Sequence, residues 1–151
     1  MVVSRIVAFL VALVVMVVLG SLAHSLMVQQ AWSDAAAAGE GVAATLSFGD
    51  RMQWILHDLV GLQPLFGGLA GVALLVAFVA GSVVARFTGL RPVVFAVAGA
   101  VAIFVLFTVL KMVLGTVGVF GARGTMGLGL QVAAGLISGL VFAALTRPRA
   151  A

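Results

Sequence analysis

The sequence contains no cysteine, and this absence excludes several kinds of functional site. Disulfide bonds, thiolate zinc sites, iron–sulfur clusters bound by cysteine and thiol redox chemistry all require sulfur side chains that the chain does not have. The absence leaves the cellular compartment open.

Charged residues are also scarce. They make up 8% of the chain, compared with about 25% in soluble globular domains. Hydrophobic residues make up 64%, and a water-soluble protein of 151 residues has no interior large enough to bury that much apolar surface. Lipid must therefore be the solvent for much of the molecule, which predicts an integral membrane protein.

The basic charge balance does not indicate nucleic-acid binding. The formal net charge is +4, but the basic residues occur singly along a hydrophobic chain and form no basic stripe. We interpret them as topology signals at helix ends. The expected partners are the lipid bilayer and either other membrane subunits or a second copy of the chain, with no nucleic acid.

Four apolar stretches are long enough to cross a hydrocarbon core of about 30 Å, which takes about 20 helical residues. Each must be helical, because an isolated strand in lipid leaves its backbone amides unpaired. The predicted fold is an all-α integral membrane protein, a four-helix transmembrane bundle that forms one domain over residues 1–151. The predicted spans are residues 6–28, 64–85, 93–114 and 125–145.

The basic residues orient this bundle. Four crossings place five arginines on one side, and a basic excess marks the cytoplasmic side. Both termini are then cytoplasmic, and the loop 29–63 is external. The excess of arginine over lysine, together with abundant alanine, valine and glycine, favours a bacterial source and hence the inner (plasma) membrane. The five arginines are Arg5, Arg86, Arg91, Arg147 and Arg149.

A signal peptide is the alternative for the first stretch. Arg5, a compact apolar run and the small residues Ser21 and Ala23 resemble a cleavable leader, which leaves three spans after cleavage. The apolar character continues to Val28, however, which gives a full-length span. We therefore expect the first span to be retained.

The external loop is predicted to contain two parts. Residues 35–41 are small and without apolar periodicity, which predicts an irregular segment. Asp50 resembles a helix N-cap, with Gln53 at the capping-box spacing. Apolar residues then recur at helical spacing, which predicts a short amphipathic helix over residues 50–62 in the headgroup region. The alternative is a bent extension of the span that begins at Pro64.

Small residues four positions apart mark the second and fourth predicted spans. Such spacing lets helix backbones approach closely in lipid, whether the partner helix belongs to the same chain or to another. The candidate packing residues are Gly67, Gly71, Ala77, Gly81, Gly135 and Gly139.

Polar residues gather near the external side and form the candidate site. In one interpretation they satisfy one another and anchor the helix ends, with Lys111 reaching the interface or pairing with Asp58. In the other they line an outward-facing vestibule centred on Asp58 and Lys111. The candidate residues are His24, His57, Asp58, Lys111, Arg123 and Gln131.

No cofactor and no metal site is expected. His24 and His57 allow a bis-imidazole haem b hypothesis, but only if the amphipathic segment folds back over the bundle. Glycine occupies every third position over residues 115–127, which predicts a tight hairpin. The alternative there is a backbone that binds an anion.

Known catalytic patterns are missing, so we expect no enzyme activity. There is no Walker loop, and Gly127-x-Gly129 lacks the third glycine of a dinucleotide fingerprint. No acidic residue lies within a predicted span and no proline interrupts one, which disfavours proton-coupled and broken-helix transporters. The leading hypothesis is an accessory, assembly or structural subunit. The alternatives are a homo-oligomeric channel or transporter and a haem- or quinone-binding redox subunit.

Overall fold

The computed structural model describes residues 2–39, 46–61, 63–115, 122 and 124–147, and all secondary structure in these ranges is helical. Four helices in this part of the chain are long and apolar enough to cross a membrane, as judged by length and composition. The predicted all-helical class with four span-length helices is therefore confirmed. The elements are α1 (Val2–Ala37), α2 (Phe48–Gly61), a π-helical segment (Gln63–Gly67), α3 (Gly68–Thr88), α4 (Arg91–Leu114) and α5 (Thr125–Leu145).

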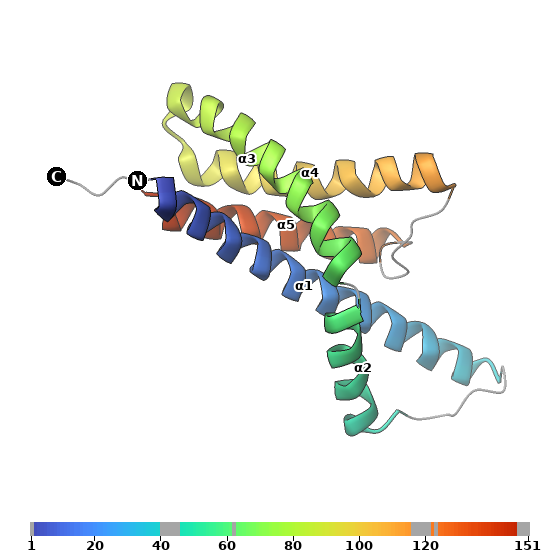
Figure 1. Cartoon of the computed structure of the whole chain (residues 1–151). Helices are drawn as coiled ribbons and strands as arrows, with labels where there is room; N and C mark the ends of the chain where they lie inside the picture. Colours follow the sequence, from blue (N-terminus) through green and yellow to red (C-terminus); the bar gives the residue numbers. More distant parts are fainter. Residues whose placement is uncertain (1, 40–45, 62, 116–121, 123, 148–151) are drawn as a thin grey trace.

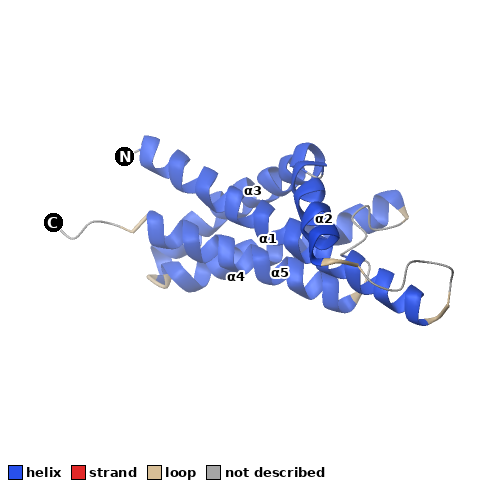
Figure 2. Ribbon diagram, turned by 90° about the horizontal axis from the view of Figure 1, so that it is seen from below, coloured by secondary structure: helices blue, strands red, loops and turns tan. Residues whose placement is uncertain are grey.

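Helices α4 and α5 form the most extensive contact between the long helices. Helix α5 also packs against α1, and α4 also packs against α3. The start of α1, the end of α5 and the turn between α3 and α4 lie at one end of the bundle, which we call the Arg91 end (Figure 1). The ends of α1 and α4 and the start of α5 lie at the opposite end, and α2 crosses α1 in the half nearer to it (Figure 1); we call this the α2 end. Because α2 crosses the direction of the long helices, Figure 2 shows it nearly end-on.

Helix α1 is longer than the predicted first span. It continues past Val28 to Ala37, so residues 29–37, predicted as loop, are helical, and the predicted irregular segment from residue 35 is wrong for its first three residues. Alanine is the strongest helix former, and the polar turn is stabilised by a hydrogen bond from Gln30 Nε2 to Asp34 Oδ1 at 2.9 Å. The helix ends before Gly39, whose φ of 75° is the left-handed conformation that glycine adopts readily.

Helix α2 begins at a capping box that differs from the predicted one. Ser47 is the N-cap, and its Oγ accepts a hydrogen bond from the Asp50 amide at 3.2 Å. The Asp50 carboxylate in turn accepts hydrogen bonds from the Ser47 amide and hydroxyl at 3.0 and 2.6 Å. Asp50 is therefore the third helical residue, and the prediction of Asp50 as the N-cap is wrong. The reciprocal bonds hold the carboxylate in its ionised form and lower the pKa of Asp50 below its ordinary value of 3.8.

A helical break separates α2 from α3. The π-helical segment contains Pro64, which has no backbone N–H to continue an α-helical ladder. Figure 1 shows α2 turned sharply away from α3 at this point. The structure gives helical residues 48–61 followed by the π-helical segment and α3, and the choice between a surface helix and a bent extension of the span stays open.

Phenylalanine rings join the four long helices near the Arg91 end. Phe78 of α3 stacks on Phe142 of α5 with ring centres 4.6 Å apart, and Phe95 of α4 meets Phe142 edge-on at 4.9 Å. Phe9 of α1 packs edge-on against Phe78 at 6.3 Å. Nearer the α2 end, Phe66 stacks on Phe107 at 6.1 Å. These contacts fill the space between the helices with aromatic side chains.

Glycines bring α4 and α5 into backbone contact. A Cβ atom added at Gly139 would lie 1.9 Å from the Phe95 carbonyl oxygen, and one at Gly135 would lie 2.5 Å from the Gly99 carbonyl oxygen. No residue with a side chain fits at such distances. The predicted packing residues Gly135 and Gly139 therefore face α4 of the same chain, and Gly99, which the sequence pattern did not identify, is their partner.

The packing glycines predicted on the second span make looser contacts. A Cβ atom added at Gly81 would lie 3.4 Å from Ala98 of α4, and one at Gly71 would lie 3.4 Å from Leu13 of α1. Both distances lie at the short limit of ordinary van der Waals contact. Gly67 lines an apolar depression between α1 and the start of α3.

Candidate functional site

A buried polar stripe runs along α1 toward the α2 end. Ser21, Ser25 and Gln29 are four residues apart and lie on one helix face, and all three are buried. His24 lies beside them and is also buried. Because an apolar helix buries polar groups only where they find partners, this stripe is the first candidate for a functional site.

Helix α2 covers the end of the stripe and is bonded to it. Ser25 donates a hydrogen bond from its hydroxyl to the Asp58 carboxylate. Gln29 Nε2 donates to the Arg51 carbonyl oxygen at 3.3 Å, and Arg51 Nη1 donates back to Gln29 Oε1 at 3.3 Å. The two tryptophans of the chain, Trp32 and Trp54, meet edge-on with ring centres 5.4 Å apart. Helices α1 and α2 therefore form one bonded unit, which we call the α1–α2 unit.

Two polar side chains of α5 are bonded to the α1 backbone. Gln131 Nε2 donates to the Gly20 carbonyl oxygen at 2.9 Å, and Ser138 Oγ donates to the Ala12 carbonyl oxygen at 2.8 Å. Gly20 leaves the room for Gln131, because a Cβ atom there would lie 2.9 Å from Gln131 Oε1. Hydrogen bonds of this kind join helices in lipid, where apolar burial supplies no driving force.

Two acceptors at the deep end of the stripe have no partner among the described residues. They are Ser21 Oγ and Gln131 Oε1, and both atoms are buried. Buried polar atoms in native proteins are nearly always bonded to protein or to ordered water. The polar neighbourhood therefore extends from Asp58 at the surface to two acceptor atoms inside the bundle.

The structure brings together only part of the predicted polar cluster. Asp58 lies close enough to His24 to interact with it electrostatically. Gln131 donates a hydrogen bond to the carbonyl oxygen of Gly20, the residue before Ser21. His57 is exposed on α2, and Lys111 is exposed on α4. Arg123 lies outside the described residues.

Asp58 and Lys111 form no ion pair in the ranges that the structure describes. The described carboxylates are bonded to neutral groups instead: Asp58 to Ser25, Asp50 to Ser47 and Asp34 to Gln30. The structure therefore gives no support to a vestibule with Asp58 and Lys111 together at its centre.

The two histidines lie in different environments. A bis-imidazole haem site encloses both rings against one prosthetic group. His24 is buried and His57 is exposed, and the described residues contain no group of three or more side chains able to hold a metal ion. The haem hypothesis therefore gains no support from these positions and stays a prediction.

At the Arg91 end, one arginine joins α4 to α5. Arg91 Nη2 donates to the Thr146 carbonyl oxygen and to Thr146 Oγ1, each at 3.1 Å, and its guanidinium lies 5.5 Å from the Phe95 ring centre. A cation at a helix C-terminus neutralises the partial negative charge of the free carbonyl groups. This arginine therefore has a local structural role.

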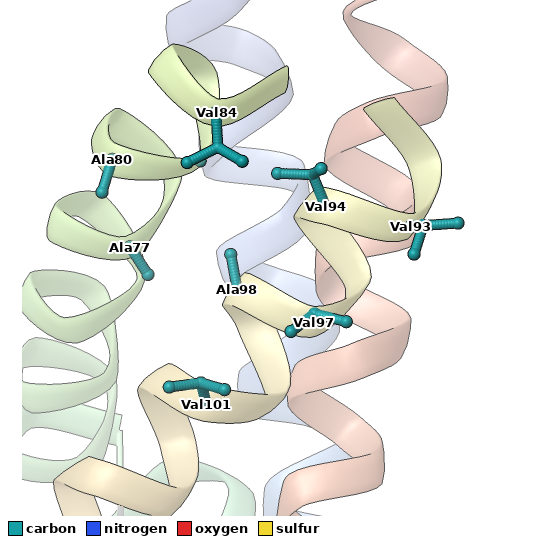
Figure 3. A pocket seen from close by; sticks show the side chains of 9 residues that line it. Ala77, Ala80, Val84, Val93, Val94, Val97, Ala98 and Val101 are labelled. Atoms are coloured by element: carbon teal, nitrogen blue, oxygen red, sulfur yellow. The ribbon is translucent and has the colours of Figure 1, made fainter. Parts of the chain in front are cut away.

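A groove lies between α3 and α4 at the same end of the bundle (Figure 3). Its volume is about 440 Å³, and its lining consists of alanine, glycine and valine side chains. Ala77 and Gly81, both predicted packing residues, line the α3 side, while Val97 and Ala98 line the α4 side. Small side chains make the groove shallow and smooth, as a surface that receives another helix requires.

Comparison with protein-family models, with curated proteins and with solved structures finds no match to this chain.

Proposed function

We propose that this protein is a small four-span membrane subunit with an accessory, assembly or structural role that acts by binding another membrane protein. Arginines gather at the Arg91 end, which we assign to the cytoplasm of a bacterium, and we place α2 at the outer surface of the inner membrane. The proposal involves no cofactor and no catalytic step.

The filled interior of the bundle is the observation that carries this proposal. Phe78, Phe95 and Phe142 close the space between the helices, and α4 and α5 touch through their backbones at Gly99 and Gly139. The polar groups Gln131 and Ser138 are bonded to α1 rather than directed into a passage. A chain whose interior is packed in this way acts through its surface.

The α1–α2 unit supplies the first binding surface. Three contacts hold it in shape: Ser25 with Asp58, Gln29 with Arg51, and Trp32 with Trp54. A surface held in one conformation loses little entropy on binding, which favours affinity for a partner. The exposed side of α2, which includes Gln53 and His57, is the part that is free for contact.

The groove between α3 and α4 supplies the second surface. Helix α3 is the least covered of the four long helices, and the walls of the groove have no polar side chain that would need a water-filled environment. A transmembrane helix of a partner subunit with small residues on one face matches this surface in shape and polarity.

A homo-oligomeric channel or transporter is the second candidate. The observation in its favour is the polar stripe, which leads from Asp58 inward to the unpartnered acceptors of Ser21 and Gln131. Because the interior of one copy is filled, the passage in this case lies between copies.

Site-directed photocrosslinking in native membranes separates the two candidates. A photoreactive residue replaces Gln53 on α2, Val97 in the groove, or Val79, which is exposed on α3 outside the groove. We expect Gln53 and Val97 to give a discrete adduct with a different protein, and Val79 to give none. Adducts only between copies of the chain support the oligomeric channel, and equal adducts from all three positions contradict a defined interface.

A further inference from the structure

A second pocket lies between α4 and the start of α5, at the α2 end of the bundle. Its volume is about 280 Å³. Its polar lining comes from Lys111, Thr108 and Thr125, and its apolar lining includes Phe104 and Leu128. The pocket is therefore polar on one side and apolar on the other, unlike the groove between α3 and α4.

Lys111 brings a positive charge to this pocket. The ranges that the structure describes contain no carboxylate paired with it, because Asp34, Asp50 and Asp58 are each bonded to neutral groups. The Thr125 side chain lines the pocket at the first residue of α5, and Gly124, at the N-cap position, provides no side-chain cap. The pocket thus offers a cation and a hydroxyl group without offering a negative charge.

The apolar residues beneath these groups face outward. Phe104 is half-exposed on a helix long and apolar enough to cross a membrane, and it lies two helical turns from Lys111 toward the middle of α4. In a bilayer this places the cation near the headgroups and the ring beside the acyl chains.

We propose that this pocket binds one phospholipid with a net negative headgroup. Lys111 and the Thr125 hydroxyl bind the headgroup phosphate, and an acyl chain lies over Phe104 and Leu128. The inference requires that α4 and α5 lie in lipid, but it does not depend on the proposed partner protein. Phosphate is the chemistry recognised, and the lipid is its source because the pocket continues into an apolar surface.

Lipid titration followed by native mass spectrometry tests this site. The full chain is purified, stripped of lipid in detergent and titrated with phosphatidylglycerol or with zwitterionic phosphatidylethanolamine. We expect tighter binding of one phosphatidylglycerol, and about a fivefold weaker affinity in Lys111→Gln, because one basic residue near an anionic lipid contributes about that factor. Lys111→Arg retains the binding.

Two further variants make the test specific. Arg86→Gln removes an exposed arginine from the last turn of α3 and should leave the first phosphatidylglycerol in place. Leu128→Trp fills the apolar side of the pocket without changing its charge and should weaken binding as Lys111→Gln does. Equal binding of the two lipids, or equal losses in Arg86→Gln and Lys111→Gln, overturns the proposal. Displacement of the lipid by millimolar inorganic phosphate assigns the site to free phosphate and also overturns it.

Discussion

Ser25 of α1 and Asp58 of α2 are joined by a hydrogen bond between residues 33 positions apart in the chain. Ser25 is completely buried, whereas Asp58 is only partly covered. The bond therefore attaches the last turn of α2 to a buried position on α1. Because Gln29 and Trp32 follow on the same helix and also contact α2, this attachment sets the position of the whole α1–α2 unit.

Removing either partner of this bond should loosen α2. We expect Ser25→Ala and Asp58→Ala each to reduce the free energy of unfolding by about 1–3 kcal/mol, because each leaves a polar group without its partner. The double variant should lose less than the sum of the two single losses. Thermal unfolding in detergent, followed by the two tryptophans, measures all three variants.

The variant Lys111→Gln provides the control for the comparison of the single and double variants of Ser25 and Asp58. Because Asp58 is bonded to Ser25 and not to Lys111, the losses from Asp58→Ala and Lys111→Gln should add within about 0.5 kcal/mol. A coupling larger than this between Asp58 and Lys111 would mean that the two charges meet after all.

The backbone contact between α4 and α5 should not tolerate a methyl group. We expect Gly139→Ala to destabilise the bundle by about 3 kcal/mol or to prevent folding, because its Cβ atom would lie 1.9 Å from the Phe95 carbonyl oxygen. Gly129→Ala on the same helix is the matched control, since no atom lies within 4 Å of its Cβ position. That change should be neutral or stabilising by up to about 1 kcal/mol. Similar melting temperatures for the two variants would argue against this helix contact.

Two variants of Gln131 separate what its hydrogen bond contributes to stability from what its packing contributes. Gln131→Leu keeps the volume, removes the hydrogen bond to Gly20 and also removes the unpartnered Oε1 atom, so its cost should stay within about 1 kcal/mol. Gln131→Ala leaves a cavity at a fully buried position and should cost about 2 kcal/mol or more. Chemical unfolding in mixed micelles gives both values. A Leu variant as unstable as the Ala variant would assign Gln131 an essential polar role.

The capping box of α2 predicts a pH dependence. Bonds from Ser47 lower the pKa of Asp50, so the carboxylate stabilises α2 at pH values above its ordinary pKa of 3.8. That stabilisation is lost as the pH falls below 3.8 through the lowered pKa. Trp32 and Trp54 are the only tryptophans and the chain has no tyrosine, so intrinsic fluorescence reports the α1–α2 contact directly.

Two variants identify Asp50 as the titrating group. Ser47→Ala should move the acid transition in tryptophan fluorescence upward, toward pH 3.8, because it removes the hydroxyl that is the main cause of the lowered pKa. Asp50→Asn should remove this component of the transition. An unchanged acid transition in both variants would show that the capping box does not control α2.

The sequence predicted the helical class and the long helices because length and apolar character alone decide whether a segment crosses a membrane. It misplaced the end of α1, since the polar turn from Gln29 to Asp34 resembles a loop when considered alone. That turn is helical in the structure, where it contacts α2, and sequence spacing does not display contacts between distant segments. The available signal for the longer helix was the four-residue spacing of the polar residues Ser21, Ser25 and Gln29.

The spacing of the polar residues did not show which way their side chains face. Of the predicted cluster, His24 and Asp58 lie close enough to interact electrostatically. Rotation about the helix axis depends on packing, and Lys111 lines the pocket beside the start of α5. In the same way, Gly20 and Gly99 were not predicted because their partners, Gln131 and Gly135, lie on another helix.

Native mass spectrometry of the protein, extracted gently from its own membrane, tests whether it works by binding a partner protein. We expect a complex of fixed stoichiometry with a second membrane protein. The complex should be lost in Val97→Trp, which fills the groove, and kept in Val79→Trp, which adds the same ring outside it. A homo-oligomer or a free monomer, unchanged by both substitutions, would refute the proposed role as a partner-binding subunit.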